Sequence, residues 1–407
     1  PDYARQESDL KNRYATLRDE RVRESVAGLT PAAAVIADPD CLRDELSKRT
    51  TLLAYALGDT TSLLWAIDRK GCDLYQIPNR TILRDEIVRV RDAISRPGLG
   101  DDALRESAHH LYEVLVAPAG DRIAESRELI IIPDGILFEL PFEALLSELP
   151  DNSAPWGDLP YLARSHSVTY SPSASVYLNL KETNKKKKYD TELLAMGDPD
   201  YSLFQDERGE PAAHDPLPSP RGEIPNIRAS LDDQDHTVRF GGDATEAVFN
   251  EQRRGGSVRV IHLATHGIVD PVEPAASNIA LCPDPAGVED GYLHTLEILS
   301  LNTNAGIVVL SACESARGRI GRGEGVVGLR RAFLASGTPG IVASLWPVSD
   351  ESTAILMGEF YERMLRKKRP ASRALNEARL VMLDDSRYAH PFYWSPFVVI
   401  GLEKSPW

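Results

Sequence analysis

AGIVVLSACES, residues 305–315, is an apolar run that ends in a single cysteine, Cys313. Continuous apolar residues without polar alternation are typical of a strand that is buried on both faces of a parallel sheet. The end of such a strand is where an enzyme can present a nucleophile, but free cysteine is also among the most buried residue types. The run by itself therefore fits a core thiol at least as well as a catalytic one.

Similar apolar runs occur on both sides of this stretch, and helical segments separate several of them. The helices are predicted over 325–337 and from Ser349 to the basic residues 366–369, where acids at the start and bases at the end match the helix macrodipole. Strands that alternate with helices indicate a parallel sheet covered on both faces, with chemistry at the carboxyl ends of its strands. The predicted strands are LLAMG (193–197), RVIHLATHG (259–267), AGIVVLSAC (305–313), GIVASLWPV (340–348) and PFVVIG (396–401).

The first half of the chain shows a mixed α/β pattern of its own. TTLLAYALG (50–58), SLLWAID (62–68) and CDLYQIP (72–78) predict strands in hairpins, two helical segments follow, and ELIIIPDG (128–135) predicts a buried strand closed by a tight turn. We therefore divide the chain into a helical segment (1–48), an N-terminal α/β domain (49–180), a Lys-rich linker (181–192) and a C-terminal α/β domain (193–407).

Composition excludes several classes of function. The net charge of −15 argues against a nucleic-acid backbone as the direct partner. No apolar run approaches the ~20 residues that span a bilayer, and the N-terminus has no signal-peptide pattern, so we expect no membrane partner. The four cysteines are scattered without CxxC spacing, which fits a reducing cytoplasm. Because the chain begins at Pro1 rather than Met, we expect a trimmed chain or the C-terminal portion of a longer protein.

Two predicted strands end in side chains that can react. One ends in His266 and Gly267, and the other ends in Cys313. If these strands are parallel neighbours, the imidazole and the thiol emerge at the same edge, and a nearby histidine favours the nucleophilic thiolate. Gly267 has no side chain, so its N–H can approach a substrate and form an oxyanion hole with the N–H of Cys313. His262 lies four residues before His266, but no third ligand has metal-site spacing, so a core histidine is favoured.

Residues 323–328 offer a competing interpretation, because GEGVVG matches the GxGxxG pattern of dinucleotide-binding proteins and opens a helix. That fingerprint needs its first glycine directly after the strand, whereas residues 314–322 intervene here. The glycines are better explained by a loop after the cysteine and close packing at the helix start. A nucleotide-dependent enzyme remains an alternative.

The motifs VIHLATHG, VVLSACES, GEGVVGLRRAFLASGTPGIVASLWPVSDESTA and HPFYWSPFVVIG resemble the CHAT family of caspase-like cysteine peptidases, relatives of caspases and separases in clan CD. The resemblance extends upstream through TTLLAYALGD, LIIIPDGILFELPFEAL and YSPSASV, to about residue 30. It implies a caspase-like parallel-sheet sandwich, preceded by a catalytically silent caspase-like α/β domain and a leading helical segment. His390 falls in an HPxYW element that implies structural docking of the last strand, and Ser315 stands where relatives often carry Thr.

The resemblance also implies an activity. It assigns His266 and Cys313 as the catalytic dyad of an endopeptidase that cleaves a protein or peptide substrate through a thioester, without a metal or an organic cofactor. Relatives often act under a sensor or repeat module, so we expect such a regulatory partner and a role in bacterial defence, including antiviral defence, or in regulated cell death. A non-catalytic caspase-like scaffold is the alternative.

Acidic residues near the predicted carboxyl edge suggest a pocket for a basic residue before the scissile bond, the P1 residue. The separase analogy places an acid near Asp350, although an aspartate there is equally explained as a helix N-cap. No arginine takes an obviously equivalent place to bind a P1 aspartate, though Arg317, Arg319 and Arg322 are near. The candidate pocket residues are Asp350, Asp198, Asp200 and Asp270.

Overall fold

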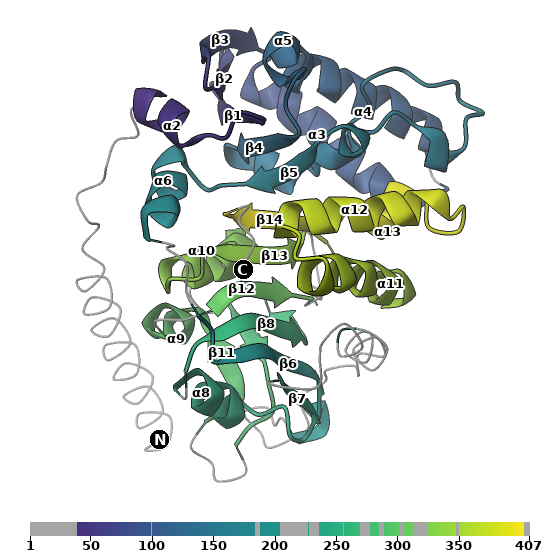
Figure 1. Cartoon of the computed structure of the whole chain (residues 1–407). Coiled ribbons are helices and arrows are strands. Elements are labelled where there is room, and N and C mark those ends of the chain that lie inside the picture. The colour runs from purple at the N-terminus through teal and green to yellow at the C-terminus, as the bar shows by residue number, and fades with distance from the viewer. Residues whose placement is uncertain are drawn as a thin grey trace, which may run out of the picture.

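The computed structural model describes residues 39–98, 100–183, 188–203, 227, 236–254, 256–268, 277–284, 289–301, 305–311, 324–346 and 350–402. Within these residues, eleven strands form one continuous sheet that draws strands from both halves of the chain (Figure 1). In spatial order the strands are β3 (Gly71–Ile77), β2 (Ser62–Asp68), β1 (Thr50–Ala56), β4 (Glu128–Ile132), β5 (Ser167–Tyr170), β14 (Phe397–Gly401), β13 (Gly340–Ser344), β12 (Ala305–Leu310), β8 (Val258–Ala264), β6 (Thr191–Pro199) and β7 (His236–Gly241).

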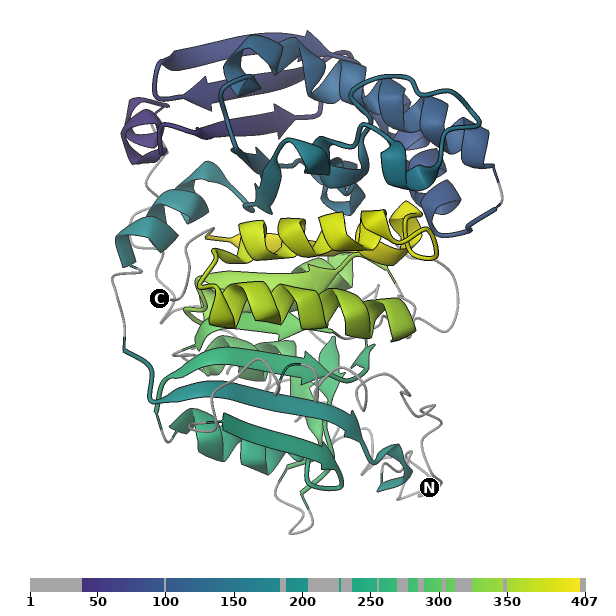
Figure 2. The ribbon, with the colours of Figure 1, turned by 45° about the vertical axis from the view of Figure 1, so that its right-hand side comes forward.

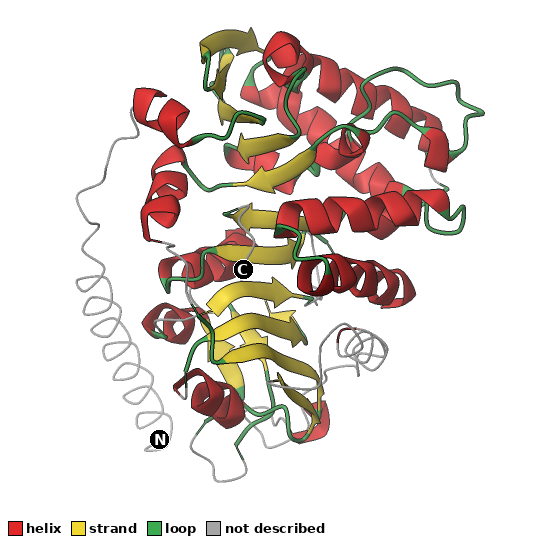
Figure 3. Cartoon of the chain, in the orientation of Figure 1, coloured by secondary structure: helices red, strands yellow, loops and turns green. Residues whose placement is uncertain are grey.

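Helices flank this sheet along its length (Figure 3). They are α2 (Pro39–Glu45), α3 (Arg80–Ile94), α4 (Asp101–Leu115), α5 (Gly120–Ile123), α6 (Ala174–Thr183), α8 (Glu246–Arg254), α9 (Thr295–Ser300), α10 (Glu324–Ala335), α11 (Asp350–Tyr361), α12 (Ala371–Asp384) and α13 (Pro391–Trp394). A π-helical turn, η8 (Glu362–Arg366), extends α11. None of the helices in the described ranges has both the length and the apolar composition to cross a membrane.

The C-terminal part of the sheet is built from strands whose apolar residues are buried on both faces, as in β12 and β13. β6, β8, β12 and β13 pair in parallel, as the sequence predicted. Two features differ from the prediction. The last strand, β14, is antiparallel to β13, and β7 was missed because its residues are only half-buried and follow a polar stretch.

Alternating side chains of this sheet face different helices. His262 of β8 contacts Tyr361 of α11 on one face. On the other face, Val398 and Ile400 of β14 lie beside Leu334 of α10. The sheet is therefore covered on both faces, with α11 and α12 in front of it in Figures 1 and 2.

The N-terminal part combines the predicted hairpins with parallel pairing. β1, β2 and β3 are antiparallel neighbours, and β1, β4 and β5 are parallel. The predicted helices appear as α3 and α4, whose buried residues include Leu83, Ile87, Leu104 and Leu111. Residues 1–38, most of the predicted helical segment, lie outside the described residues.

The two parts meet where β14 pairs in parallel with β5, with Ile400 opposite Tyr170. Helix α12 packs on this junction: Arg379 forms a fully buried ion pair with Glu143 at 2.8 Å, and Glu143 also accepts a hydrogen bond of 2.7 Å from the Tyr170 hydroxyl. The structure thus joins the two predicted α/β domains through one sheet and a shared core. Their division into separate domains stays a prediction.

His390 links the segment before β14 to the N-terminal part. Its Nδ1 accepts a hydrogen bond from the Phe392 N–H at 3.1 Å and so begins α13. Its ring packs edge-on against Trp156, with centroids 4.6 Å apart, and its Nε2 lies 3.9 Å from Asp101. These contacts agree with the docking role that the sequence suggested.

The burial of His390 predicts a loss of stability in acid. Burial lowers the pKa of His390 to about 4, from 6.5 in an exposed chain, although Asp101 opposes the shift. Between these values the unfolded chain binds the proton more readily, so the free energy of unfolding falls as the pH drops from about 6.5 to 4, by at most ~3 kcal/mol. Denaturation midpoints across this range check the prediction. His390→Asn, which can still cap α13, should flatten this part of the profile, and an unchanged profile would contradict it.

Candidate active site

The edge formed by the carboxyl ends of β8 and β12 brings the predicted dyad strands together. These strands are parallel neighbours, and Leu263 lies opposite Leu310. The pairing continues past β12, because the N–H of Ser311 donates to the Leu263 carbonyl at 3.0 Å. The sequence predicted both strands and left their adjacency as a condition, which the structure meets. Cys313 itself lies outside the described residues.

His266 lies just beyond β8, which ends three residues earlier than predicted. Its side chain is buried within a close set of contacts. The His266 backbone N–H donates to the Tyr201 hydroxyl at 3.1 Å, and the two rings lie 4.8 Å apart, tilted by 47°. The His266 carbonyl accepts a hydrogen bond of 2.9 Å from the Ala280 N–H. His266 is therefore held from two sides at the carboxyl edge of the sheet.

Gly267 begins a small antiparallel sheet of β9 (Gly267–Ile268), β10 (Asn278–Ala280) and β11 (Tyr292–His294). The peptide unit between His266 and Gly267 fixes the direction of the Gly267 N–H. Its carbonyl oxygen points to β10, where Ala280 donates to it, and in a trans peptide the N–H points the opposite way. The Gly267 N–H is thus directed away from β10, as an oxyanion donor requires.

Two of the four candidate pocket acids are described with their side chains. Asp198 lies at a register irregularity near the end of β6, between Gly197 and Pro199, and is buried, with a positive φ of 46°. Asp200 accepts hydrogen bonds from the N–H and the hydroxyl of Ser202, at 3.1 and 2.6 Å. Both lie at the end of β6, on the side of β8 opposite β12. Asp350 is the first residue of α11, and Asp270 lies outside the described residues.

His262 is a core residue rather than half of a metal pair. It is fully buried, its Nδ1 is 2.8 Å from the Tyr361 hydroxyl, and burial lowers its pKa to about 3, so it is neutral. Among the described residues, no group of three histidine, cysteine or acidic side chains could hold a metal ion. Of the GxGxxG pattern, Gly323 lies outside the described residues, and α10 begins at the next residue.

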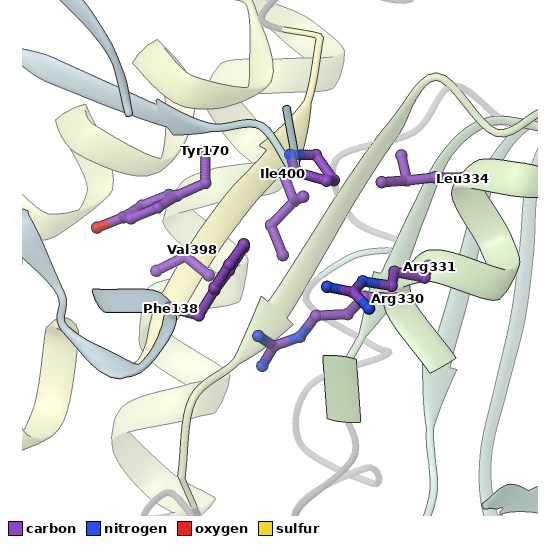
Figure 4. Close-up of a pocket in the computed structure, with 8 residues that line it drawn as sticks. Phe138, Tyr170, Arg330, Arg331, Leu334, Val398 and Ile400 are labelled. Carbon is purple, nitrogen blue, oxygen red and sulfur yellow. The ribbon is translucent and has the colours of Figure 1, made fainter. Parts of the chain in front are cut away.

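A pocket is present at the junction of the two parts of the sheet (Figure 4). Apolar side chains from β5 and β14 form one side, and α10 forms the other with Arg330, Arg331 and Leu334. Its volume of about 20 Å³ is that of roughly one water molecule, too small for a peptide side chain. Arg330 donates to the carbonyl of Ser344, the last residue of β13, at 2.6 Å, so this hydrogen bond ties α10 to the strand end.

Sequence reasoning missed the residues that surround His266. Tyr201 was given no role although it follows the pocket candidates Asp198 and Asp200, and Ala280 belongs to an unpredicted strand of only three residues. One signal was available for Tyr201: it follows LLAMG, the predicted strand that precedes the histidine strand in the chain, and parallel strands end at the same edge of a sheet.

Comparisons with known proteins bear on the family and the fold of this chain. The family model described as the CHAT domain matches residues 105–402. Tetratricopeptide repeat protein 28 of Mus musculus is 32% identical over 130 residues, which cover 32% of this chain and 5% of that protein. The Homo sapiens protein of the same name is 32% identical over 124 residues, covering 30% and 5%. This chain thus spans only a small part of these relatives.

Among solved structures, the Saccharomyces cerevisiae separase–securin complex at 2.6 Å resolution superimposes with a TM-score of 0.53 at 12% identity. The match covers 89% of this chain and 30% of that one. At this identity the likeness shows a shared fold.

Proposed function

Because the chain belongs to the CHAT domain family and has a caspase-like fold, we propose that it is a cysteine endopeptidase in which Cys313 is the nucleophile and His266 the base. The parallel pairing of β8 with β12 carries the proposal. Leu263 and Leu310 lie opposite each other, each three residues before a member of the dyad. If the register continues, His266 and Cys313 are level at the edge where parallel sheets hold their sites.

The proposed reaction uses no group beyond the chain and water. His266 takes the proton of the Cys313 thiol, and the sulfur attacks the substrate carbonyl carbon to give a tetrahedral intermediate. The intermediate collapses when His266 returns the proton to the leaving amine, which leaves a thioester. Water, deprotonated by His266, then attacks the thioester, releases the carboxylic acid and restores the thiol.

The N–H groups of Gly267 and Cys313 are the proposed oxyanion donors. The direction of the Gly267 N–H, away from β10, supports this role. Donors fixed by the backbone need no reorganisation when charge develops on the substrate oxygen, and each contributes substantially to the rate.

The substrate is proposed to carry Arg or Lys at P1, with Asp350 as the leading pocket residue and Asp198, Asp200 and Asp270 as the other candidates. Asp350 is the first residue of α11, the helix that follows β13 in the chain. Because β13 is parallel to β12, its carboxyl end lies at the same edge as those of the dyad strands. The names of the mouse and human relatives support control by a helical repeat module attached to or bound by this chain.

A peptide library tests the activity and the P1 preference together. Wild type should cleave after Arg or Lys, and Cys313→Ala should cleave nothing. Asp350→Asn should lower kcat/KM for basic P1 peptides by about 100-fold, because it removes one partner of a charge pair, with little effect on peptides that have a neutral P1. Asp198→Asn and Asp200→Asn remove the same charge at the other candidates, on the other side of β8, and are compared with Asp350→Asn in the same assay. A preference for Asp at P1 contradicts the pocket assignment, and no cleavage by any preparation favours the scaffold alternative.

A further inference from the structure

Tyr201 is a buried residue whose contacts converge on the candidate catalytic histidine. It begins the short 3₁₀ turn η6 (Tyr201–Leu203), which follows β6 after one residue, and is only 4% exposed. Its hydroxyl accepts from the His266 backbone N–H at 3.1 Å and lies 3.1 Å from Thr265 Oγ1. Its ring packs on the imidazole of His266 at a centroid distance of 4.8 Å. The same side chain therefore contacts both the backbone and the ring of His266.

We propose that Tyr201 is a positioning residue for His266: its hydroxyl fixes the backbone that leaves β8, and its ring holds the imidazole at the carboxyl edge of the sheet. The proposal rests on the proposed function, because it assigns Tyr201 a role in the orientation of the base. It adds a residue to the site that no motif had indicated.

The Tyr201 hydroxyl holds the backbone at the point where the strand pairing of β8 ends. β8 ends at Ala264, so Thr265 and His266 lie outside its ladder. Thr265 Oγ1 donates its one proton to the Ala280 carbonyl, which leaves it to accept from the Tyr201 hydroxyl. Tyr201, Thr265 and Ala280 thus form a chain of hydrogen bonds that replaces the missing strand contacts. Burial raises the pKa of Tyr201 to about 12, so its hydroxyl keeps the proton this chain needs.

The ring has a second effect on the base. The two rings are tilted by 47° with centroids 4.8 Å apart, within the distance of about 6 Å over which an aromatic ring attracts a cation. When His266 takes a proton from the nucleophile it becomes an imidazolium, and the neighbouring ring stabilises that charge. A packed ring also limits the rotation of the imidazole.

Tyr201 is itself fixed by the segment on its other side. The N–H of the preceding residue, Asp200, donates to Cys282 Sγ at 3.0 Å. The Cys282 thiol in turn donates to the Gly241 carbonyl at 3.1 Å. Burial raises the pKa of the Cys282 thiol to about 11, so it stays protonated and able to donate. The turn that carries Tyr201 is therefore anchored to β7 and to the segment that follows β10.

Three variants separate positioning from packing. Tyr201→Phe keeps the ring and removes the hydroxyl, Tyr201→Leu removes both, and Tyr55→Phe is the matched control. Tyr55 is a buried tyrosine of the N-terminal part whose hydroxyl donates to the Leu115 carbonyl at 2.8 Å. Each variant is assayed for kcat and KM on the best library peptide, and for the rate at which diethyl pyrocarbonate modifies His266, followed by mass spectrometry.

We expect kcat to fall about 10-fold in Tyr201→Phe and about 100-fold in Tyr201→Leu, with KM unchanged, because the base is displaced while the peptide still binds. Modification of His266 should accelerate several-fold in Tyr201→Leu, whereas Tyr55→Phe should match wild type in both assays. Wild-type values in both Tyr201 variants, or equal losses in Tyr55→Phe, overturn the proposal. If the wild-type protein cleaves nothing, the proposed function fails, and the modification rates still show whether Tyr201 holds His266.

Discussion

Peptide cleavage falls by about 10⁴-fold or more when Cys313 is replaced with alanine, if Cys313 is the nucleophile. The attack that forms the thioester needs a sulfur atom at this position, and alanine leaves only the contribution of binding and of the oxyanion donors. His266→Ala should cause a loss of similar size, because thiolate formation and protonation of the leaving amine both depend on the imidazole. The measurement is kcat/KM on the best peptide of the library.

The combination of variants shows whether the two residues act as one unit. The double variant should be no slower than either single variant, because residues of one catalytic unit give non-additive losses. Cys72→Ala is the matched control, since it removes an exposed thiol on β3, and it should keep wild-type activity. Full activity in Cys313→Ala would refute the assignment, as would losses in the double variant that simply multiply.

Arg379→Met should destabilise the protein by about 3–5 kcal/mol, the largest stability effect we expect from a single substitution. Arg379 and Glu143 are 1% and 0% exposed, and their 2.8 Å ion pair joins α12 to the N-terminal part. Removal of the guanidinium leaves the Glu143 carboxylate buried, with the Tyr170 hydroxyl as its remaining hydrogen-bond donor in these contacts. A buried charge without its counter-ion costs far more than the pair itself contributes.

The same helix supplies the control. Arg373 of α12 forms an ion pair of 2.9 Å with Glu377, and the Arg373 side chain is 56% exposed. Arg373→Met should therefore cost less than about 1 kcal/mol. Adding Glu143→Gln to Arg379→Met should recover much of the loss, because no charge is then left buried. The denaturation midpoint of each variant is the measurement, and equal midpoints for Arg379→Met and Arg373→Met would contradict the account.

Periodicity predicted most of the individual elements. The apolar runs at 259–267 and 305–313 become the adjacent strands β8 and β12, because residues buried on both faces leave few alternatives to a central strand. The hairpins of β1 to β3 were predicted for a similar reason, since short turn segments separate their apolar runs. The order of ATHG and SAC along the chain also pointed to the edge that carries the candidate dyad.

What the sequence could not supply depends on contacts between distant segments. The antiparallel direction of β14 depends on the path of the chain through α11, α12 and α13, the helices between β13 and β14, and no local pattern encodes that path. The ion pair between Arg379 and Glu143 joins residues far apart in the chain, and each looks like a surface residue when taken alone. Tyr201 reaches His266 only because β6 and β8 are neighbours in the sheet.

Alkylation of Cys313 by iodoacetamide tests the central claim, that His266 activates this thiol, without the need for a substrate. The rate is measured by peptide mapping, with the exposed thiol of Cys72 as an internal reference. We predict that Cys313 of the wild-type protein reacts faster than Cys72. In His266→Ala the alkylation rate of Cys313 should fall to the Cys72 rate or below. His109→Ala, which replaces a histidine of the N-terminal part, should leave the Cys313 rate unchanged. A Cys313 that stays inert in the wild type, or that reacts equally fast without His266, would contradict the account.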